Sequence, residues 1–330
     1  MGGNALKHSN TKRVGRAEHA RVGEQVLAKL GQRFPGHRLE IIPAYAQKTE
    51  FGNVSVFFQS DVHRAKKELS DELKVLFDSA QAVRHDNRIS VAVDGLQVDI
   101  SVISSAHFQL ALDYHSFNML GGLIGQLANA VGLTLRDTGM VLRVINGSHL
   151  STEIPVASTW SEILDILGLS YHRWCKGFAT LSEMFAFVTT SPVFQKDLFQ
   201  DSSYQDIPAG QPLRITQKFG LWLDTVSARE LPTLEPVTKE AWLARLMALR
   251  PDVKAPYDAA IQFGIDRAAA SQKLNGNVVR NLTGLDNEAL GKFMKALRDS
   301  FGSESAQVAW VLTASNKDIV SKITTLRKAL

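Results

Sequence analysis

The sequence predicts an α+β protein whose strands are concentrated in the first third of the chain. One observation is the pair Asp94-Gly95, which separates two alternating apolar segments, 88–93 and 96–103, and favours the type I′ turn of a hairpin. Another is that apolar residues recur mostly at helical spacing from about residue 105 onward. We therefore expect an α/β module over 1–110 and a mostly helical region over 111–330.

The elements of the first module are predicted from the spacing of apolar residues and from the proline and glycine residues that end a helix. Apolar residues at helical spacing predict a helix over 17–34, which Pro35-Gly36 ends. Short apolar runs predict strands over 39–42 and 51–58, and a charged amphipathic segment predicts a helix over 61–78.

In the remainder, the pattern predicts mainly helices and two short strands within 134–145. The helices are expected over 116–131 and near 158–167, 181–188, 214–226, 239–249, 255–270 and 286–300. Proline-bounded segments at 208–212 and 232–236 predict loops.

Composition predicts an ordinary soluble globular protein. The chain has 330 residues, 45% hydrophobic and 21% charged, which allows two domains. It contains neither a run of about 18 apolar residues nor an apolar secretory signal, so we expect a cytoplasmic protein with no membrane partner. A single cysteine, Cys175, excludes an intramolecular disulfide. The net charge of +4 is a mild bias toward polyanions.

The predicted strand 51–58 carries polar residues on one face. Side chains alternate along a strand, so Asn53 and Ser55 project from the same side, just after the turn residue Gly52. On the second strand of the hairpin, Asp99 shares a face with Gln97, whereas the apolar residues beside it share the other. The pattern predicts one carboxylate, one amide and one hydroxyl on strand faces of the same module.

This order of elements resembles the core of the DNA polymerase β-like nucleotidyltransferase superfamily. In that family a glycine precedes Asp-x-Asp on a strand, a helix follows, and a hairpin carries a third carboxylate. More specifically, the chain resembles nucleotidyltransferases of large phages and other viruses. The segments that carry this second resemblance are Met1–Leu6, Ile42–Lys48, Phe51-Gly52, Asn118–Gly125, Gly139–Leu142, Gly177-Phe178, Met184–Phe187, Phe219–Leu223, Asn275-Gly276, Thr283–Leu285 and Leu290-Gly291.

The resemblance implies a mixed sheet with flanking helices and a two-metal phosphoryl-transfer site. Asn53 and Ser55 occupy the positions of the first two carboxylates, so Asp99 alone is left as a catalytic and metal-binding candidate. The nucleotide-binding candidates are Lys48, Gly52, Lys66 and Lys67.

Mg²⁺ is expected only if the protein is active, because a two-magnesium site normally draws on several anionic ligands. Glu50 and Asp61 are near enough in sequence to be considered as substitutes. However, Glu50 precedes the turn, and Asp61 has the position of a helix N-cap.

Basic residues suggest where a nucleic acid would bind. The first forty residues are rich in Lys and Arg, and Lys12, Arg13 and Arg16 are the candidates there. The alternative is a solvated helix face. A second candidate pair is Arg173 and Lys176, with Trp174 stacking on a base; the alternative there is a helix with Trp174 in the core and its cations at the surface.

Three functions follow. The first is a catalytically defective pseudoenzyme that binds nucleotide or nucleic acid, RNA rather than DNA. The second is an active template-independent nucleotidyltransferase that acts on RNA ends with substitute metal ligands. The third is a structural or interaction protein of a viral particle or complex, whose partners would be viral proteins. The phage resemblance implies the host cytoplasm as location, or the virion for the third function.

Overall fold

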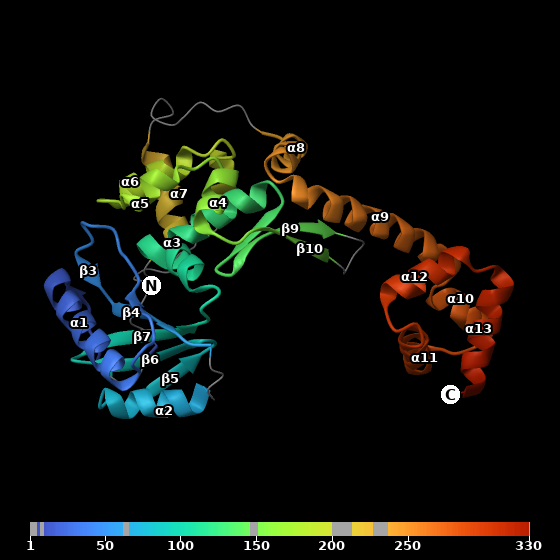
Figure 1. Ribbon diagram of the computed structural model, residues 1–330, viewed down its shortest axis with the longest axis horizontal. Coiled ribbons are helices and arrows are strands. Elements are labelled where there is room, and N and C mark those ends of the chain that lie inside the picture. The colour runs from blue at the N-terminus through green and yellow to red at the C-terminus, as the bar shows by residue number, and fades with distance from the viewer. Residues whose placement is uncertain are drawn as a thin grey trace. The chain divides into compact units, whose positions relative to one another are not determined.

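The computed structural model describes residues 5–6, 10–61, 66–145, 151–199, 213–226 and 237–329, which belong to two compact units (Figure 1). The first unit comprises Met1–Val141 and Pro155–Leu249, and the second Leu142–Ile154 and Arg250–Leu330. The functional boundary expected at residue 110 stays a prediction. No helix in the described ranges is long and apolar enough to cross a bilayer.

The first unit contains a mixed five-stranded sheet with the order β2-β4-β7-β6-β5. Its strands are β2 (Leu39–Ile41), β4 (Asn53–Gln59), β5 (Ala82–His85), β6 (Arg88–Val93) and β7 (Leu96–Ile103). β4 and β7 are parallel, and the other neighbouring strands are antiparallel. The predicted hairpin is confirmed: Asp94 and Gly95 have φ angles of 49° and 73°, both positive as a type I′ turn requires.

The strand predicted over 51–58 is divided at Gly52. The residues before the glycine form β3 (Glu50–Phe51), which pairs with β1 (Val14–Gly15). The residues after it form β4, which lies between β2 and β7. The expectation of one continuous strand was therefore wrong, because the two sides of Gly52 pair with different parts of the chain.

The two faces of the five-stranded sheet differ in chemistry. One face is apolar and packs against α1 (Arg16–Arg33) and α2 (Lys66–Leu76), as its buried Val54, Val56 and Ile100 show. Part of the other face packs against α3 (Phe108–Ala130), where Phe57 contacts the start of that helix. Figure 1 shows α1 and α2 on one side of the sheet and α3 on the other. The polar residues of β4 and β7 therefore lie on the α3 side.

Helix α3 is interrupted near its middle. The expected helix over 116–131 is confirmed in its second half, but α3 begins at Phe108 and loses helical geometry over Ser116–Met119. Just after the interruption, a Cβ built on Gly121 would lie 2.3 Å from the carbonyl oxygen of Tyr114, so no other residue fits without a shift of the backbone.

The rest of the first unit is mostly helical. Its helices are α4 (Trp160–Ile166), α5 (Tyr171–Cys175), α6 (Leu181–Thr189), the 3₁₀ helix η1 (Lys196–Phe199), α7 (Ile215–Thr225) and α8 (Lys239–Leu249). A second sheet has the order β10-β9-β8, with β8 (Leu133–Arg136), β9 (Gly139–Ile145) and β10 (Ser151–Ala157). The sequence predicted two of these strands and missed β10.

The C-terminal part of the second unit is helical. Its helices are α9 (Pro251–Lys273), α10 (Gly276–Thr283), α11 (Asn287–Asp299), α12 (Glu304–Thr313) and α13 (Asn316–Ala329). Phe293, Leu297 and Val311 are buried in the core that these helices share. The α+β class and the mainly helical C-terminal region are thus confirmed, although α10, α12 and α13 were not predicted and α5 was expected only in the alternative interpretation of the segment around Trp174. The loops expected at 208–212 and 232–236 lie outside the described residues.

Candidate functional site

The polar residues singled out in the sequence meet on one face of the sheet. In the parallel pair β4–β7, Ser55 lies beside Asp99 and Asn53 beside Gln97. In the antiparallel pair β6–β7, Ser90 lies on the other side of Asp99. Strand alternation places these five side chains on the face away from α1 and α2. The register therefore brings the three positions expected to hold carboxylates together.

The Asp99 carboxylate is buried and accepts hydrogen bonds from three neutral side chains. Its Oδ1 accepts from the Ser90 hydroxyl at 2.5 Å and from Gln97 Nε2 at 2.8 Å, and its Oδ2 accepts from Asn53 Nδ2 at 2.7 Å. The side chain is only 4% exposed. Gln97 is fixed in turn, because its Oε1 accepts from the backbone N–H of Ala5 at 2.9 Å. Uncharged donors from three strands thus stabilise a buried charge.

The residues at this point do not fit a two-magnesium site. Asn53 Nδ2 donates to Ser55 Oγ at 2.8 Å as well as to Asp99, so the amide occupies the space between the other two side chains. Mg²⁺ requires near-octahedral oxygen ligands, and a pair of such ions requires several negative charges. Only one charge is present here. Within the described ranges, no group of three or more His, Cys, Asp or Glu is arranged to hold a metal.

The two acidic residues considered as substitutes are engaged elsewhere. Glu50 lies 3.4 Å from the guanidinium of Arg13 in an exposed ion pair. Asp61 accepts a hydrogen bond from the backbone N–H of Ser105 at 2.7 Å. The segment that Asp61 was expected to cap lies partly outside the described residues. Neither carboxylate joins Asp99.

Lys48 is half-buried beside the start of β4. Its Nζ donates to Oδ1 of Asn118 at 2.9 Å and lies 4.7 Å from the centre of the Phe51 ring. Lys48 is also surrounded by other basic residues. Burial, and then the charges of Lys218, Arg13 and Arg16, lower the pKa of Lys48 to about 8. An ammonium group is thus held in place where positive charge is already concentrated.

Arg16 and His19 complete this basic cluster around Phe51. The Arg16 guanidinium donates to the carbonyl oxygens of Tyr45 and Lys48 at 3.1 and 3.0 Å. The His19 ring stacks on Phe51 at 3.9 Å. Burial, and then the charge of Lys48, lowers the pKa of His19 to about 4, so the imidazole is neutral near pH 7. Lys48 and Arg16 therefore carry the charge beside the buried ring.

The partner of Lys48 comes from a strained segment. Phe117, Asn118 and Met119 have φ angles of 53°, 60° and 65°, and such left-handed geometry costs on the order of 1–3 kcal/mol for each non-glycine residue. The segment is anchored because the backbone N–H of Phe117 donates to the carbonyl of Pro43 at 2.8 Å. Strain of this kind is concentrated at functional sites.

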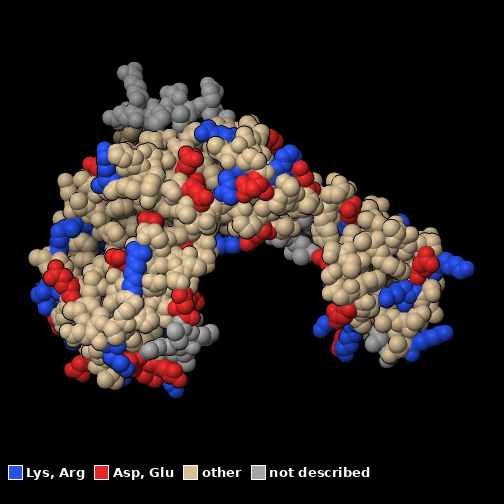
Figure 2. All heavy atoms as spheres, viewed as in Figure 1, with Lys and Arg blue, Asp and Glu red and all other residues tan. Residues whose placement is uncertain are grey.

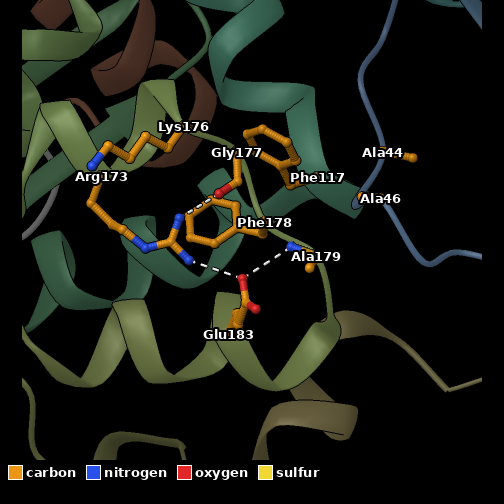
Figure 3. Close-up of a pocket in the computed structure, with 9 residues that line it drawn as sticks. All are labelled: Ala44, Ala46, Phe117, Arg173, Lys176, Gly177, Phe178, Ala179 and Glu183. Carbon is orange, nitrogen blue, oxygen red and sulfur yellow. Dashed lines mark hydrogen bonds and ion pairs between the residues drawn. The ribbon is translucent and has the colours of Figure 1, made fainter.

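A hollow of about 400 Å³ lies next to the same segments (Figure 3). It is lined by Ala44, Ala46, Phe117, Arg173, Lys176, Gly177, Phe178, Ala179 and Glu183. Figure 3 shows the Phe178 ring beside the Arg173 guanidinium, which lies 4.7 Å from the ring centre and forms a 3.0 Å ion pair with Glu183. Its walls thus combine aromatic surface with one fixed ion pair.

Trp174 does not line this hollow, contrary to its expected role in stacking. It is 4% exposed and packs edge-on against Phe117 and Phe178. The alternative interpretation of this segment, a core tryptophan beside surface cations, is confirmed for Trp174. Arg173 pairs with Glu183, while Lys176 is exposed at the rim.

The structure separates the other predicted residues. Gly52 directly precedes Asn53, as expected. By contrast, Lys66 and Lys67 begin α2 and follow the opposite end of β4, which ends at Gln59. The side chain of Lys66 lies outside the described residues, and that of Lys67 is exposed. Neither Asn118 nor Lys218 was singled out as a site residue, although one segment of the resemblance begins at Asn118.

Several of the described cations of the N-terminal segment form ion pairs with acidic residues. Arg13 pairs with Glu50, Arg21 with Glu18 and Asp94, and Arg33 with Glu72. Lys12 is exposed next to the hairpin turn, where its backbone N–H donates to the carbonyl of Gly95. Figure 2 shows basic and acidic residues interspersed over the visible face of the molecule.

The functional interpretation rests on the geometry of the site, because comparison with protein families and with curated proteins gives no match. No protein-family model matches the chain, and a search of curated proteins finds no significant match.

Proposed function

We propose that the first unit contains a nucleotidyltransferase-type module that binds the phosphate groups of a nucleotide or of RNA without turnover. The observation that carries this proposal is the register of β4 and β7, which puts Asn53, Ser55 and Asp99 on one face. This is the arrangement that the family resemblance implies for three metal-binding carboxylates. Here two of the three are neutral.

The chemistry of these side chains supports binding rather than catalysis. Nucleotidyl transfer depends on positioning and on metal ions that neutralise the charge developing on the phosphoryl oxygens. Asp99 supplies the only charge among the three positions, and its oxygens already accept three hydrogen bonds. Lys48 and Arg16 nevertheless retain positive charge beside the strand, which favours a phosphate ligand.

Restoring the two carboxylates tests this proposal. We expect the unaltered chain to bind labelled nucleotide or RNA and to transfer no nucleotide to RNA ends with Mg²⁺ or Mn²⁺. The double substitution Asn53→Asp and Ser55→Asp brings three carboxylates together. Their mutual repulsion should make the folded protein depend on the metal, so Mg²⁺ should raise the Tm of this variant and leave that of the unaltered chain unchanged.

The same variant should gain detectable transfer, and adding Asp99→Ala to it should abolish this activity. Turnover by the unaltered chain that is lost on Asp99→Ala would contradict the pseudoenzyme and favour substitute metal ligands. If neither protein binds nucleotide or RNA, and Mg²⁺ stabilises neither, the nucleotidyltransferase interpretation itself is wrong.

A further inference from the structure

Positive charge lies around Phe51, just before the start of β4. The Nζ of Lys48 and the Cζ of Arg16 lie 4.7 and 5.6 Å from the centre of the same Phe51 ring. Phe51 is buried, and Asn53 follows it by two residues. The ring therefore holds both cations close to the start of β4.

These cations are not neutralised by acidic partners. Lys48 donates to an amide oxygen, and Arg16 donates to two backbone carbonyls. In the part of the chain that the structure describes, neither makes an ion pair. The charged groups that act on Lys48 are Lys218, Arg13 and Arg16, and of these Arg13 has Glu50 as a partner. An anion placed here would gain attraction from several cations.

We infer that Lys48 and Arg16, supported by Lys218, form a site that binds the phosphate groups of a nucleoside polyphosphate without a divalent cation. This inference rests on the proposed function and adds the ligand class and the independence from metal. In a metal-dependent site the ions neutralise the phosphate oxygens. In this chain an ammonium and a guanidinium group supply that charge.

The neighbouring hollow can hold the base of the same ligand. Ala44 and Ala46 belong to the segment that continues to Lys48, and Phe117 directly precedes the Lys48 partner Asn118. Backbone bonds from Ala46 to Phe178 and from Gln47 to Ala179, both 2.8 Å long, fix this segment against the far wall. The half-buried Phe117 offers apolar surface on which a nucleobase can stack, whereas Phe178 is buried beneath the Arg173 guanidinium (Figure 3).

Nucleotide binding in the presence and absence of metal is the test. We expect the full chain to bind a labelled nucleoside triphosphate in excess EDTA about as tightly as in Mg²⁺. Lys48→Gln should weaken binding by about tenfold or more, since it removes a charge-assisted contact. Lys74→Gln is the matched control, because Lys74 is exposed on α2, is not among the charged groups that act on Lys48, and should leave the affinity unchanged. Circular dichroism establishes that each variant is folded.

Each result that would contradict this inference overturns a different part of it. Binding that requires Mg²⁺ would overturn the metal-free site and leave the proposed function in place. Binding in EDTA that is insensitive to Lys48→Gln would overturn the assignment of the site. Binding of an RNA oligonucleotide alone, with no competition by the triphosphate, would overturn the ligand class. Absence of all binding would overturn the proposed function too.

The pH dependence gives an independent readout. In the free protein Lys48 loses its proton as the pH rises through about 8, whereas a bound phosphate favours the charged form. Affinity should therefore be highest below pH 8 and fall by up to about tenfold for each pH unit above it. The other charged groups that act on Lys48 are Lys218, Arg13 and Arg16, and His19 is neutral throughout this range.

Lys48→Arg keeps a permanent charge at the same position and should flatten the profile between pH 7 and pH 9. A profile that is identical in the two proteins would assign the titration to another group and would contradict the role of Lys48.

Discussion

Replacement of Gly121 by alanine is expected to destabilise the first unit by about 3 kcal/mol or more. The new Cβ would lie 2.3 Å from the carbonyl oxygen of Tyr114 and 3.0 Å from its carbonyl carbon. Both are backbone atoms, so no flexible side chain can move away. The two halves of α3 approach one another here because Phe117, Asn118 and Met119 turn the chain through left-handed geometry. Separating the halves would disturb that turn.

Gly122→Ala provides the matched control. A Cβ at Gly122 meets no atom within 4 Å, and the position is helical, so alanine should be neutral or stabilise by about 0.5–1 kcal/mol. Urea unfolding followed by tryptophan fluorescence measures both variants. Four of the five tryptophans, Trp160, Trp174, Trp222 and Trp242, belong to the first unit and report on it. Equal midpoints for the two variants would contradict the close approach at Gly121.

Asp99→Ala should also destabilise the protein strongly, by about 3 kcal/mol. The substitution leaves the buried Ser90 hydroxyl and Gln97 amide without their acceptor, whereas the half-buried Asn53 amide keeps Ser55 Oγ as a partner. An unpaired buried polar group costs about 1–3 kcal/mol, and two of them are created here. Asp99→Asn keeps one acceptor oxygen and nearly the same shape, so it should cost less than alanine.

The comparison separates a structural carboxylate from a catalytic one. Chemical denaturation of the two variants gives their free energies of unfolding. If Asp99 serves only a metal, removing it from the metal-free protein would relieve a buried charge, and Asp99→Ala would be neutral or stabilising. We expect the opposite order of stability: the unaltered chain first, then Asp99→Asn, then Asp99→Ala.

The sheet could be predicted from the sequence because its signals are local. Alternation along 88–93 and 96–103 fixes which side chains share a face, and Asp94-Gly95 fixes the turn and hence the register. The same alternation placed Asn53 and Ser55 on one face. What the pattern did not contain was the break at Gly52, because the pairing of β3 with β1 depends on a segment about 35 residues earlier in the chain.

The basic cluster could be predicted only in part. Lys48 was identified, but its partner Asn118 lies 70 residues away and reaches it through the interruption of α3. Asparagine tolerates left-handed geometry, whereas phenylalanine and methionine rarely adopt it, so residue preferences favour an unbroken helix there. The short α5 has five residues, too few for periodicity to be informative. In α13, by contrast, the buried Ile319 and Ile323 are four residues apart, a helical signal that could have been used.

The parallel pairing of β4 with β7 has a consequence for the order of folding. The bond between Ser90 and Asp99 spans nine residues and belongs to a tight hairpin, which forms within microseconds in small systems. The bond between Asn53 and Asp99 spans 46 residues and requires closure of a long loop that contains α2. We therefore expect Asp99 to be solvated while the hairpin forms and to become buried only when β4 docks. The docking of one strand would then assemble the polar face and the start of the basic cluster in a single late step.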